Sequence, residues 1–441
     1  MISMLASQEP TGKLGPEPWL TAPETVRVFA ALQRDGADVR FVGGCVRDAL
    51  AHKHVSDIDI GTPDPPNRVM ALLAADGIKT VPTGIDHGTV TAVIDKHTFE
   101  ITTLRCDVET DGRRAVVAYT EDWIVDSSRR DFTINALSAT PDGDIYDYHD
   151  GIPDLAHGKV RFIGRADARI EEDHLRILRY FRFYGHYGRP PADVAAFNAC
   201  RKHAEKLREI SAERIRHEVL RILMAPDPAD VFLLMKNAHV LDEVLPEAGN
   251  IGRLRATAWL ATRALVLDGL HPDPVRRLGA SLSADADASA VGSRLRLSNR
   301  ESDRLVKMTE IVHALREPLS ESATRRLVHM HGGEAVADAT ILAWAERLAE
   351  VAKLPSDETG ARRKMLETAL AWKSPTFPIG GTDAQALGLE RGPQIGKALR
   401  SVEDWWAASG FSADRDACLA HLQKAIQDMS TQKSQKKDND K

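Results

Sequence analysis

The pattern of strand-forming and helix-forming segments changes once along this chain, near residue 165. Before that point, runs rich in Val, Ile and Thr with period-two alternation occur at 39–44, 56–61, 88–95 and 98–105, among segments with helical spacing. Beyond it, strand patterns nearly vanish and amphipathic helical patterns follow one another. The expected fold is a small α/β head, a mixed sheet with helices, followed by an all-helical remainder.

The length of 441 residues is more than one ordinary domain needs. From the patterns we expect five parts. They are a flexible lead (1–20), a head (21–160), a helical neck (161–225), a helical body and tail (226–428), and a polar, disordered C-terminal segment (429–441).

Composition excludes several classes of protein. No stretch approaches 18 uninterrupted apolar residues, so we expect no membrane span, and the N-terminus lacks the basic and apolar regions of a signal peptide. The four cysteines are scattered without a CxxC or metal-ligand spacing, which predicts reduced thiols in a cytoplasmic protein: Cys45, Cys106, Cys200 and Cys418.

Charge is unevenly distributed. The formal net charge of −6 taken alone argues against a nucleic-acid partner. However, 159–189 contains eight Lys/Arg against four Asp/Glu, and 201–221 contains seven against four. The middle of the chain is therefore locally basic, and this local charge is compatible with a polyanionic partner such as a nucleic acid.

Two aspartates stand one residue apart in the strand-like stretch VSDIDIG. Because side chains on a strand alternate between faces, Asp57 and Asp59 share one face. Like charges this close repel unless a cation lies between them, and Mg²⁺ prefers such oxygen ligands. Glu100, in a second predicted strand, is a candidate third ligand. The alternatives are loop carboxylates capping the turn at Gly61, and a glutamate at a strand edge.

A glycine turn precedes the acidic pair. In VRFVGGCVRDAL a predicted strand ends at Gly43 and Gly44, and a helix follows with Arg47 in its first turn. Glycines let the backbone approach a bulky anion, and an arginine supplies charge for phosphate. Together with the D-x-D stretch this pattern predicts a metal–triphosphate site; the alternative is a tight turn with a surface arginine.

On these residues the chain resembles the bacterial class II tRNA nucleotidyltransferases and poly(A) polymerases of the DNA polymerase beta superfamily. FVGGCVRDAL with DIDIG is similar to the first motif of that family. Four more segments follow in the family's order: SRRDFTINALS (128–138), DYHDGIPDL (147–155), EEDHLRILRYFRF (171–183) and AERIRHEVLRIL (212–223). A weaker likeness lies in the tail, at 378–399.

The resemblance implies a nucleotidyltransferase head and template-independent addition of CCA to the 3′ end of tRNA. The substrates would be CTP and ATP, the cofactor Mg²⁺ and the second product pyrophosphate. It places Arg130 at the bound nucleotide, gives base reading to Asp173 and Arg176, and implies base or phosphate contacts for Arg179 and Arg182. The helical body and tail would bind the tRNA.

The base-reading pair has a physical rationale. On one helix, Asp173 and Arg176 would be i,i+3 neighbours on a shared face. A carboxylate accepts from the amino group of cytosine or adenine while an arginine donates to the adjacent ring nitrogen; uracil and guanine present the opposite polarity. Each mispaired group costs about 1–3 kcal/mol. The alternative is an ordinary ion pair on a solvent-exposed helix.

Three other functions stay open. A poly(A) polymerase shares the scaffold, but the family's Arg-Arg-Phe stretch between the first two motifs is absent here. An enzyme adding only CC or only A is a second; the long polar loop predicted at 106–128 resembles the loop that full CCA addition requires. A tRNA-binding protein without activity is the third, against which the intact D-x-D stretch argues.

Overall fold

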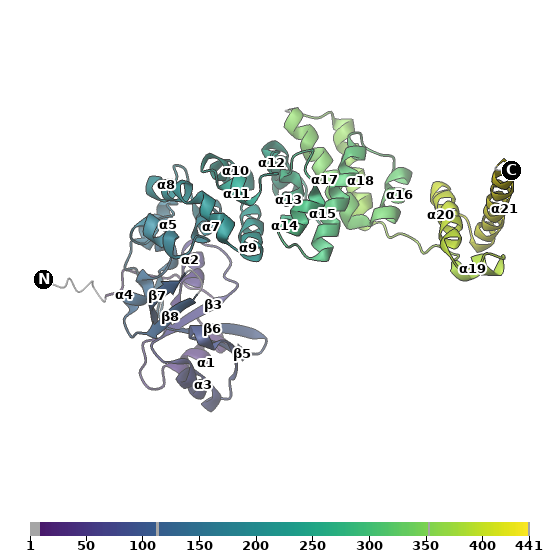
Figure 1. Ribbon diagram of the computed structural model, residues 1–441. Coiled ribbons are helices and arrows are strands. Elements are labelled where there is room, and N and C mark those ends of the chain that lie inside the picture. Colours follow the sequence, from purple (N-terminus) through teal and green to yellow (C-terminus); the bar gives the residue numbers. More distant parts are fainter. Residues whose placement is uncertain (1–8, 112–113, 352, 440–441) are drawn as a thin grey trace. The chain divides into compact units, whose positions relative to one another are not determined.

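The structure is a computed structural model and describes residues 9–111, 114–351 and 353–439. Contacts divide the chain into two compact units, Met1–Ala248 and Gly249–Lys441. The first unit contains the sheet and the neck helices, and the second is helical (Figure 1). The predicted division into an α/β head and a helical remainder is confirmed. No helix of the described residues is long and apolar enough to cross a membrane.

The head is built on an eight-stranded sheet with the order β1-β10-β9-β2-β3-β6-β5-β4. All neighbours pair antiparallel except β3 and β6, which run parallel, with Asp59 opposite Glu100. The strands are β1 (Gly12–Lys13), β2 (Arg40–Val42), β3 (Ile58–Thr62), β4 (Lys79–Gly84), β5 (Thr89–Ile94), β6 (His97–Thr103), β9 (Ser138–Ala139) and β10 (Asp144–Tyr146).

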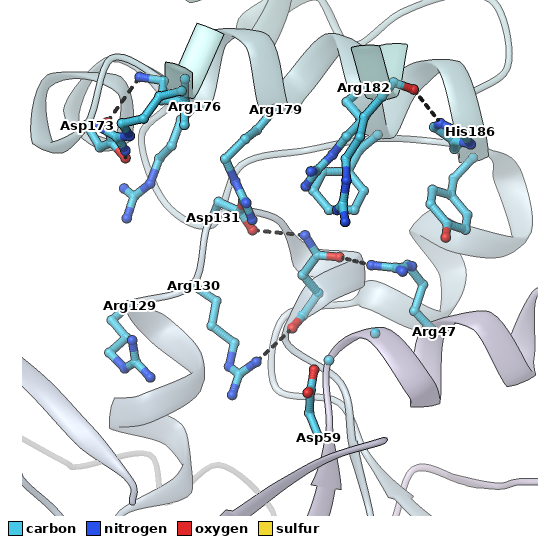
Figure 2. A pocket seen from close by; sticks show the side chains of 18 of the residues that line it. Arg47, Asp59, Arg129, Arg130, Asp131, Asp173, Arg176, Arg179, Arg182 and His186 are labelled. Carbon is cyan, nitrogen blue, oxygen red and sulfur yellow. Dashed lines mark hydrogen bonds and ion pairs between the residues drawn. The ribbon is translucent and has the colours of Figure 1, made fainter. Parts of the chain in front are cut away.

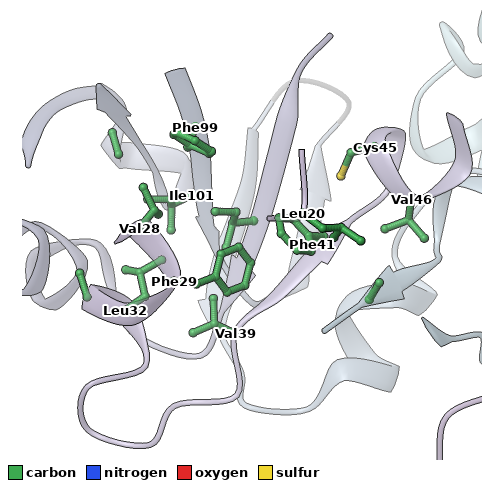
Figure 3. Packing of buried hydrophobic residues seen from close by; sticks show 14 of the residues in the cluster. Leu20, Val28, Phe29, Leu32, Val39, Phe41, Cys45, Val46, Phe99 and Ile101 are labelled. Atoms are coloured by element: carbon green, nitrogen blue, oxygen red, sulfur yellow. The ribbon is translucent and has the colours of Figure 1, made fainter. Parts of the chain in front are cut away.

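Three helices accompany this sheet: α1 (Pro23–Leu32), α2 (Gly44–Leu50) and α3 (Pro66–Ala75). Apolar side chains from α1, α2 and the central strands form one buried cluster (Figure 3). Phe41 of β2 is fully buried, with its ring 4.3 Å from that of Phe29. The cluster fixes the central strands against the helices, and thereby the strand end that carries Asp59.

Further helices of the head, the neck and the start of the body complete the first unit. They are α4 (Trp123–Ser128), α5 (Gly151–His157), α6 (Ala166–Glu172), α7 (Arg176–Tyr187), α8 (Val194–Lys202), α9 (Ala212–Leu223), α10 (Pro228–Asn237) and α11 (Val240–Val244). The aromatic face of α7 packs inward, with Tyr180 and Phe181 fully buried. A short 3-10 turn, Thr133–Asn135, lies beneath α7 in the pocket described below.

In the second unit, α17 (Gly333–Glu350) is buried along Ala335–Ala345 and packs against α12 (Ile251–Trp259), α15 (Asn299–Val312) and α18 (Ser356–Ala371). Its small side chains permit this close approach. Asp338 of α17 has no exposed side chain and is paired with Arg276 and Arg304. The other helices are α13 (Pro274–Ser281), α14 (Ala288–Arg294), α16 (Glu321–His331), α19 (Gly381–Ala386), α20 (Pro393–Ala408) and α21 (Arg415–Asn439).

Four sequence expectations differ from the structure. The predicted lead is ordered over residues 9–20, because Gly12 pairs with Ile145 and Leu20 is buried in the head cluster; residues 1–8 lie outside the described residues. The segment 429–439 continues α21 as a helix instead of being disordered, and residues 440–441 are not described. The predicted loop at 106–128 contains a hairpin, β7 (Arg105–Asp111) and β8 (Arg114–Tyr119), and then α4.

The fourth difference concerns the helix predicted at 171–183. It is two helices, because α6 ends at Glu172 and α7 begins at Arg176. Asp173 lies between them in extended backbone, and its carboxylate accepts the backbone N–H of Leu175 at 3.1 Å. A side-chain bond to the amide two residues ahead competes with the helical pattern. Asp173 and Arg176 are therefore not i,i+3 neighbours on one helix.

Candidate active site

A cavity of about 690 Å³ lies between the sheet end, the Thr133–Asn135 turn and helices α7 and α9 (Figure 2). Its lining includes eight arginines and only three aspartates among the described residues. The predicted site residues in its wall are Gly43, Gly44, Arg47, Asp59, Arg130, Asp173, Arg176, Arg179 and Arg182. Asp57 and Glu100 are not in the wall.

Asp59 stands on β3, half-buried, while Asp57 precedes that strand and is exposed. Burial, the charge of Glu100 and, after it, that of Asp57 raise the pKa of the Asp59 carboxyl to about 6, although Arg130 and Arg47 act against this. Asp59 therefore lies close enough to both other carboxylates for their charges to act on it. No group of three His, Cys, Asp or Glu side chains arranged to hold a metal ion occurs among the residues that the structure describes.

The glycine turn adopts the conformation that only glycine accepts readily. Gly43 has φ of 66°, and a Cβ there would meet the Arg130 guanidinium at 3.0 Å. A Cβ on Gly44 would lie 4.0 Å from the Asp59 carboxylate and 3.8 Å from the Arg47 guanidinium. The turn thus brings backbone, carboxylate and two arginines together without side chains between them.

The head arginines are held by neighbours. Arg47 is buried; it donates to Asn135 at 2.6 Å and to Asp48 at 3.0 Å. Arg129 and Arg130 both pair with the buried Asp126 of α4. Burial opposes ionisation of Asp126, yet Arg130 and Arg129 lower its pKa below the usual value.

The neck residues are also paired. The Arg214 guanidinium donates to Asp173 at 2.7 Å, and Arg176 forms an ion pair with Glu172. Arg179 donates to Asp131 at 2.6 Å, and Arg182 donates to Glu218 of α9 at 3.1 Å. Burial lowers the pKa of Arg182 to about 10, although Glu218 opposes this.

Sequence reasoning missed Arg214, Arg221 and Tyr187 as members of the pocket wall. The two arginines lie in AERIRHEVLRIL, which was noted as a motif without a role for either residue. Tyr187 carried no signal, because a tyrosine on an amphipathic helix is usually a core residue. Here its hydroxyl donates to Asp48 and the Arg47 guanidinium lies 4.5 Å from its ring centre.

The class of this protein follows from family models: the chain matches nucleotidyltransferases of the poly(A) polymerase class. Residues 39–161 match the family described as "Poly A polymerase head domain", and residues 194–250 match "Probable RNA and SrmB- binding site of polymerase A".

Full-length relatives narrow the class. The chain is 33% identical to the mitochondrial CCA tRNA nucleotidyltransferase 1 of Danio rerio over 88% of each chain. It is 30% identical to the CCA-adding enzyme of Streptococcus uberis over 85% of this chain and 90% of that one. The chain belongs to the family of CCA tRNA nucleotidyltransferases.

Solved structures share the fold. The CCA-adding enzyme of Bacillus stearothermophilus in complex with CTP superposes with a TM-score of 0.74, at 24% identity over 95% of this chain and 100% of that one. The Thermotoga maritima CCA-adding enzyme complexed with tRNA_CCA gives a TM-score of 0.58 at 19% identity, over 91% of this chain and 95% of that one.

Proposed function

We propose that this protein adds CCA to the 3′ end of tRNA from CTP and ATP and releases pyrophosphate. The observation that carries the proposal is the pocket that joins Asp59, the glycine turn and the arginines of α7 in one cavity. Such a cavity suits a nucleotide whose triphosphate lies at the sheet end and whose base lies against the neck.

Asp57 and Asp59 would hold Mg²⁺, with Glu100 as a further candidate ligand. The donor chemistry fits, because all three are carboxylates; burial first, and then the charges of Glu100 and Asp57, raise the pKa of Asp59. Mg²⁺ commonly uses one or two carboxylates and completes its shell with substrate phosphates and water. When bound, it would activate the RNA 3′-hydroxyl and neutralise the charge of the leaving pyrophosphate.

The glycine turn and the head arginines would bind the triphosphate. Gly43 and Gly44 leave room for a phosphate beside the backbone, and Arg47 and Arg130 supply positive charge there. These two guanidiniums already have partners on their other sides, which fixes their direction. Fixed donors lose little conformational entropy when a ligand binds.

Asp173 and Arg176 would read the edge of the base. The position of Asp173 supports this role. It stands in the break between α6 and α7, and hydrogen bonds from Arg214 and the Leu175 amide hold its carboxylate in place. Arg179 lies beside them in the pocket wall as a further contact to base or phosphate. Arg182, paired with buried Glu218, would act by holding α7 against α9 as much as by direct contact.

The test is incubation of purified protein with tRNA lacking its CCA end, Mg²⁺ and nucleotides given singly or together. CTP with ATP should give three added residues, CTP alone two. A long tract of A would point to a poly(A) polymerase, and addition that stops at CC or gives only A would point to a partial enzyme. Absence of any product, with tRNA still bound, would leave a binding protein.

The second unit would supply the tRNA-binding body and tail, and binding there should weaken with salt. We also propose a reducing, cytoplasmic location, since all four cysteines are free thiols in the structure. One of the two relatives above carries a mitochondrial name and the other is bacterial, so fractionation of the source cells is the measurement that decides the compartment.

A further inference from the structure

One buried amide in the pocket contacts both sides of the proposed nucleotide site. Asn135 ends the Thr133–Asn135 turn and is only 7% exposed. It comes from the motif SRRDFTINALS, in which the sequence suggested Asp131 and Asn135 only as groups that contact the sugar or hold the loop. Its side chain is neither on the sheet end nor on the neck helices, but between them.

The hydrogen bonds of this amide form a continuous chain. The Asn135 side-chain oxygen accepts from Arg47 at 2.6 Å, and its nitrogen donates to Asp131 at 2.9 Å. The other oxygen of Asp131 accepts from Arg179 at 2.6 Å. In Figure 2, one dashed line marks the bond from Arg47 to the Asn135 side chain, and a second marks the bond from that side chain to Asp131. The figure also shows Arg179 directly beside Asp131.

The polarity of the chain requires an amide at this position. Arg47 can only donate, and an ionised Asp131 can only accept, so the group between them must accept on one side and donate on the other. Burial opposes ionisation of Asp131, but Arg179 and then Asn135 lower its pKa below the usual value, so it is ionised near neutral pH. An asparagine meets both demands, and its orientation is fixed by them.

We propose that Asn135 is a positioning residue that links triphosphate binding to base selection. It ties Arg47, on the phosphate side, to Arg179, on the base side, through Asp131. The inference rests on the proposed function, because it assigns Arg47 and Arg179 to the two ends of one nucleotide. A triphosphate that binds to Arg47 would therefore influence the position of α7 through Asn135, Asp131 and Arg179. The base is read beside that helix.

The backbone of Asn135 also contacts the phosphate side of the pocket. Its carbonyl oxygen accepts from Arg130 at 3.4 Å and lies 3.4 Å from the point where a Cβ on Gly43 would be. The residue therefore touches the glycine turn, a phosphate-side arginine and, through Asp131, the neck. Arg47 keeps two bonds to Asp48 independently of Asn135, so breaking the link leaves Arg47 paired.

The test uses three variants of the full-length protein in the addition assay with CTP and UTP. Asn135→Asp has the same shape and still accepts from Arg47, but it sets a second carboxylate against Asp131 and breaks the link. Asp131→Asn breaks it from the other side. The double variant restores a donor facing an acceptor, at the loss of the bond from the Phe132 amide. Asn198→Ala, exposed on α8, is the control.

We expect the ratio of kcat/KM for CTP over UTP to fall about tenfold or more in each single variant and to recover in part in the double variant. The KM for CTP should change less than the ratio, because Arg47 remains held. A structural role alone would lower the melting temperature and the yield of active protein without changing the ratio. Melting curves for all variants separate these cases.

Two outcomes would overturn the inference. A wild type that rejects UTP, with an Asn135→Asp variant that rejects it equally well, overturns the inference and leaves the proposed function standing. A wild type that takes CTP and UTP alike overturns both. If Asn135→Asp does not fold, the comparison of Asp131→Asn with the double variant is the test. A double variant whose CTP-over-UTP ratio is no higher than that of Asp131→Asn would then overturn the link.

Discussion

Asp59, a proposed magnesium ligand, is the residue whose proposed role would lower the stability of the fold. Its carboxyl is half-buried near two other carboxylates, which with burial raises its pKa to about 6 from an unfolded value near 4. Because the folded pKa lies above the unfolded one, the folded state binds the proton more tightly. The penalty for ionising Asp59 is thus absent below about pH 4, grows between pH 4 and 6, and is complete above pH 6.

We predict that Asp59→Asn abolishes nucleotide addition but raises the free energy of unfolding at pH 7, without metal, by about 1–3 kcal/mol. Urea titrations with and without Mg²⁺ measure this, and the exposed Asp142→Asn serves as the control. Retained turnover, or an unchanged stability in metal-free buffer, would contradict the assignment.

The same pKa gives a prediction for the metal. Protons compete with Mg²⁺ for Asp59, so the Mg²⁺ concentration at half-maximal activity should rise about tenfold per pH unit below pH 6 and be nearly constant above pH 7. Mg²⁺ titrations between pH 5.5 and 8 show this directly. A half-maximal Mg²⁺ concentration that stays constant from pH 5.5 to 8 would contradict binding by a carboxyl with a pKa near 6.

A third prediction concerns base reading. Arg176→Ala should let UTP or GTP compete with CTP and ATP, because the donor to the ring nitrogen is lost; the expected loss of discrimination is about tenfold to a hundredfold. Competition assays with mixed nucleotides measure it, with the exposed Arg201→Ala of α8 as the matched control. Unchanged discrimination in Arg176→Ala refutes the role.

At the scale of elements, the contact between α7 and α9 depends on a buried ion pair. Arg182 and Glu218 are 7% and 2% exposed and lie 3.1 Å apart. We predict that Glu218→Ala lowers the free energy of unfolding by about 3–5 kcal/mol, because Arg182 is left charged and buried. Adding Arg182→Met should recover most of this in urea titrations; a double variant as unstable as Glu218→Ala would show that the pair is not the cause.

The elements also show what local pattern can and cannot predict. The strands of VRFVGG, SDIDIG, GTVTAVID and TFEITTLR are all present, since alternation and β-branched residues report burial of one face. The break at Asp173 was missed because the amphipathic spacing runs through it, while a single side-chain bond to the Leu175 amide ends the helix. Pairing of Asp173 with Arg214, 41 positions away, has no local signal.

At the scale of the whole molecule, the residues of the candidate active-site pocket all lie between Gly43 and Met224, within the first compact unit. We predict that a fragment of residues 1–248 folds and binds CTP with a Kd within about tenfold of the full chain, while the KM for tRNA rises steeply. Calorimetry with CTP, after circular dichroism has confirmed a cooperative melt, is the measurement. A folded fragment that does not bind CTP would place part of the nucleotide site in the second unit.

Long-range pairing sets the limit of prediction for the whole chain. Gly12–Lys13 joins the sheet through Asp144 and Ile145, more than a hundred residues away, so the expected flexible lead is an edge strand. The motifs predicted a metal–triphosphate site, and the structure brings most of the residues named for it into one cavity. Its internal connections, from Arg47 through Asn135 to Arg179, needed the fold, because each bond joins separate segments.

Among the described residues, the pocket wall contains eight arginines against three aspartates. This surplus affects the choice of buffer for assays. So many fixed cations attract whatever multivalent anion the solution offers. Inorganic phosphate, sulfate or citrate in a storage buffer should act as a weak competitive inhibitor against CTP. Kinetic constants taken in chloride or acetate buffers will therefore differ from those taken in phosphate at equal ionic strength.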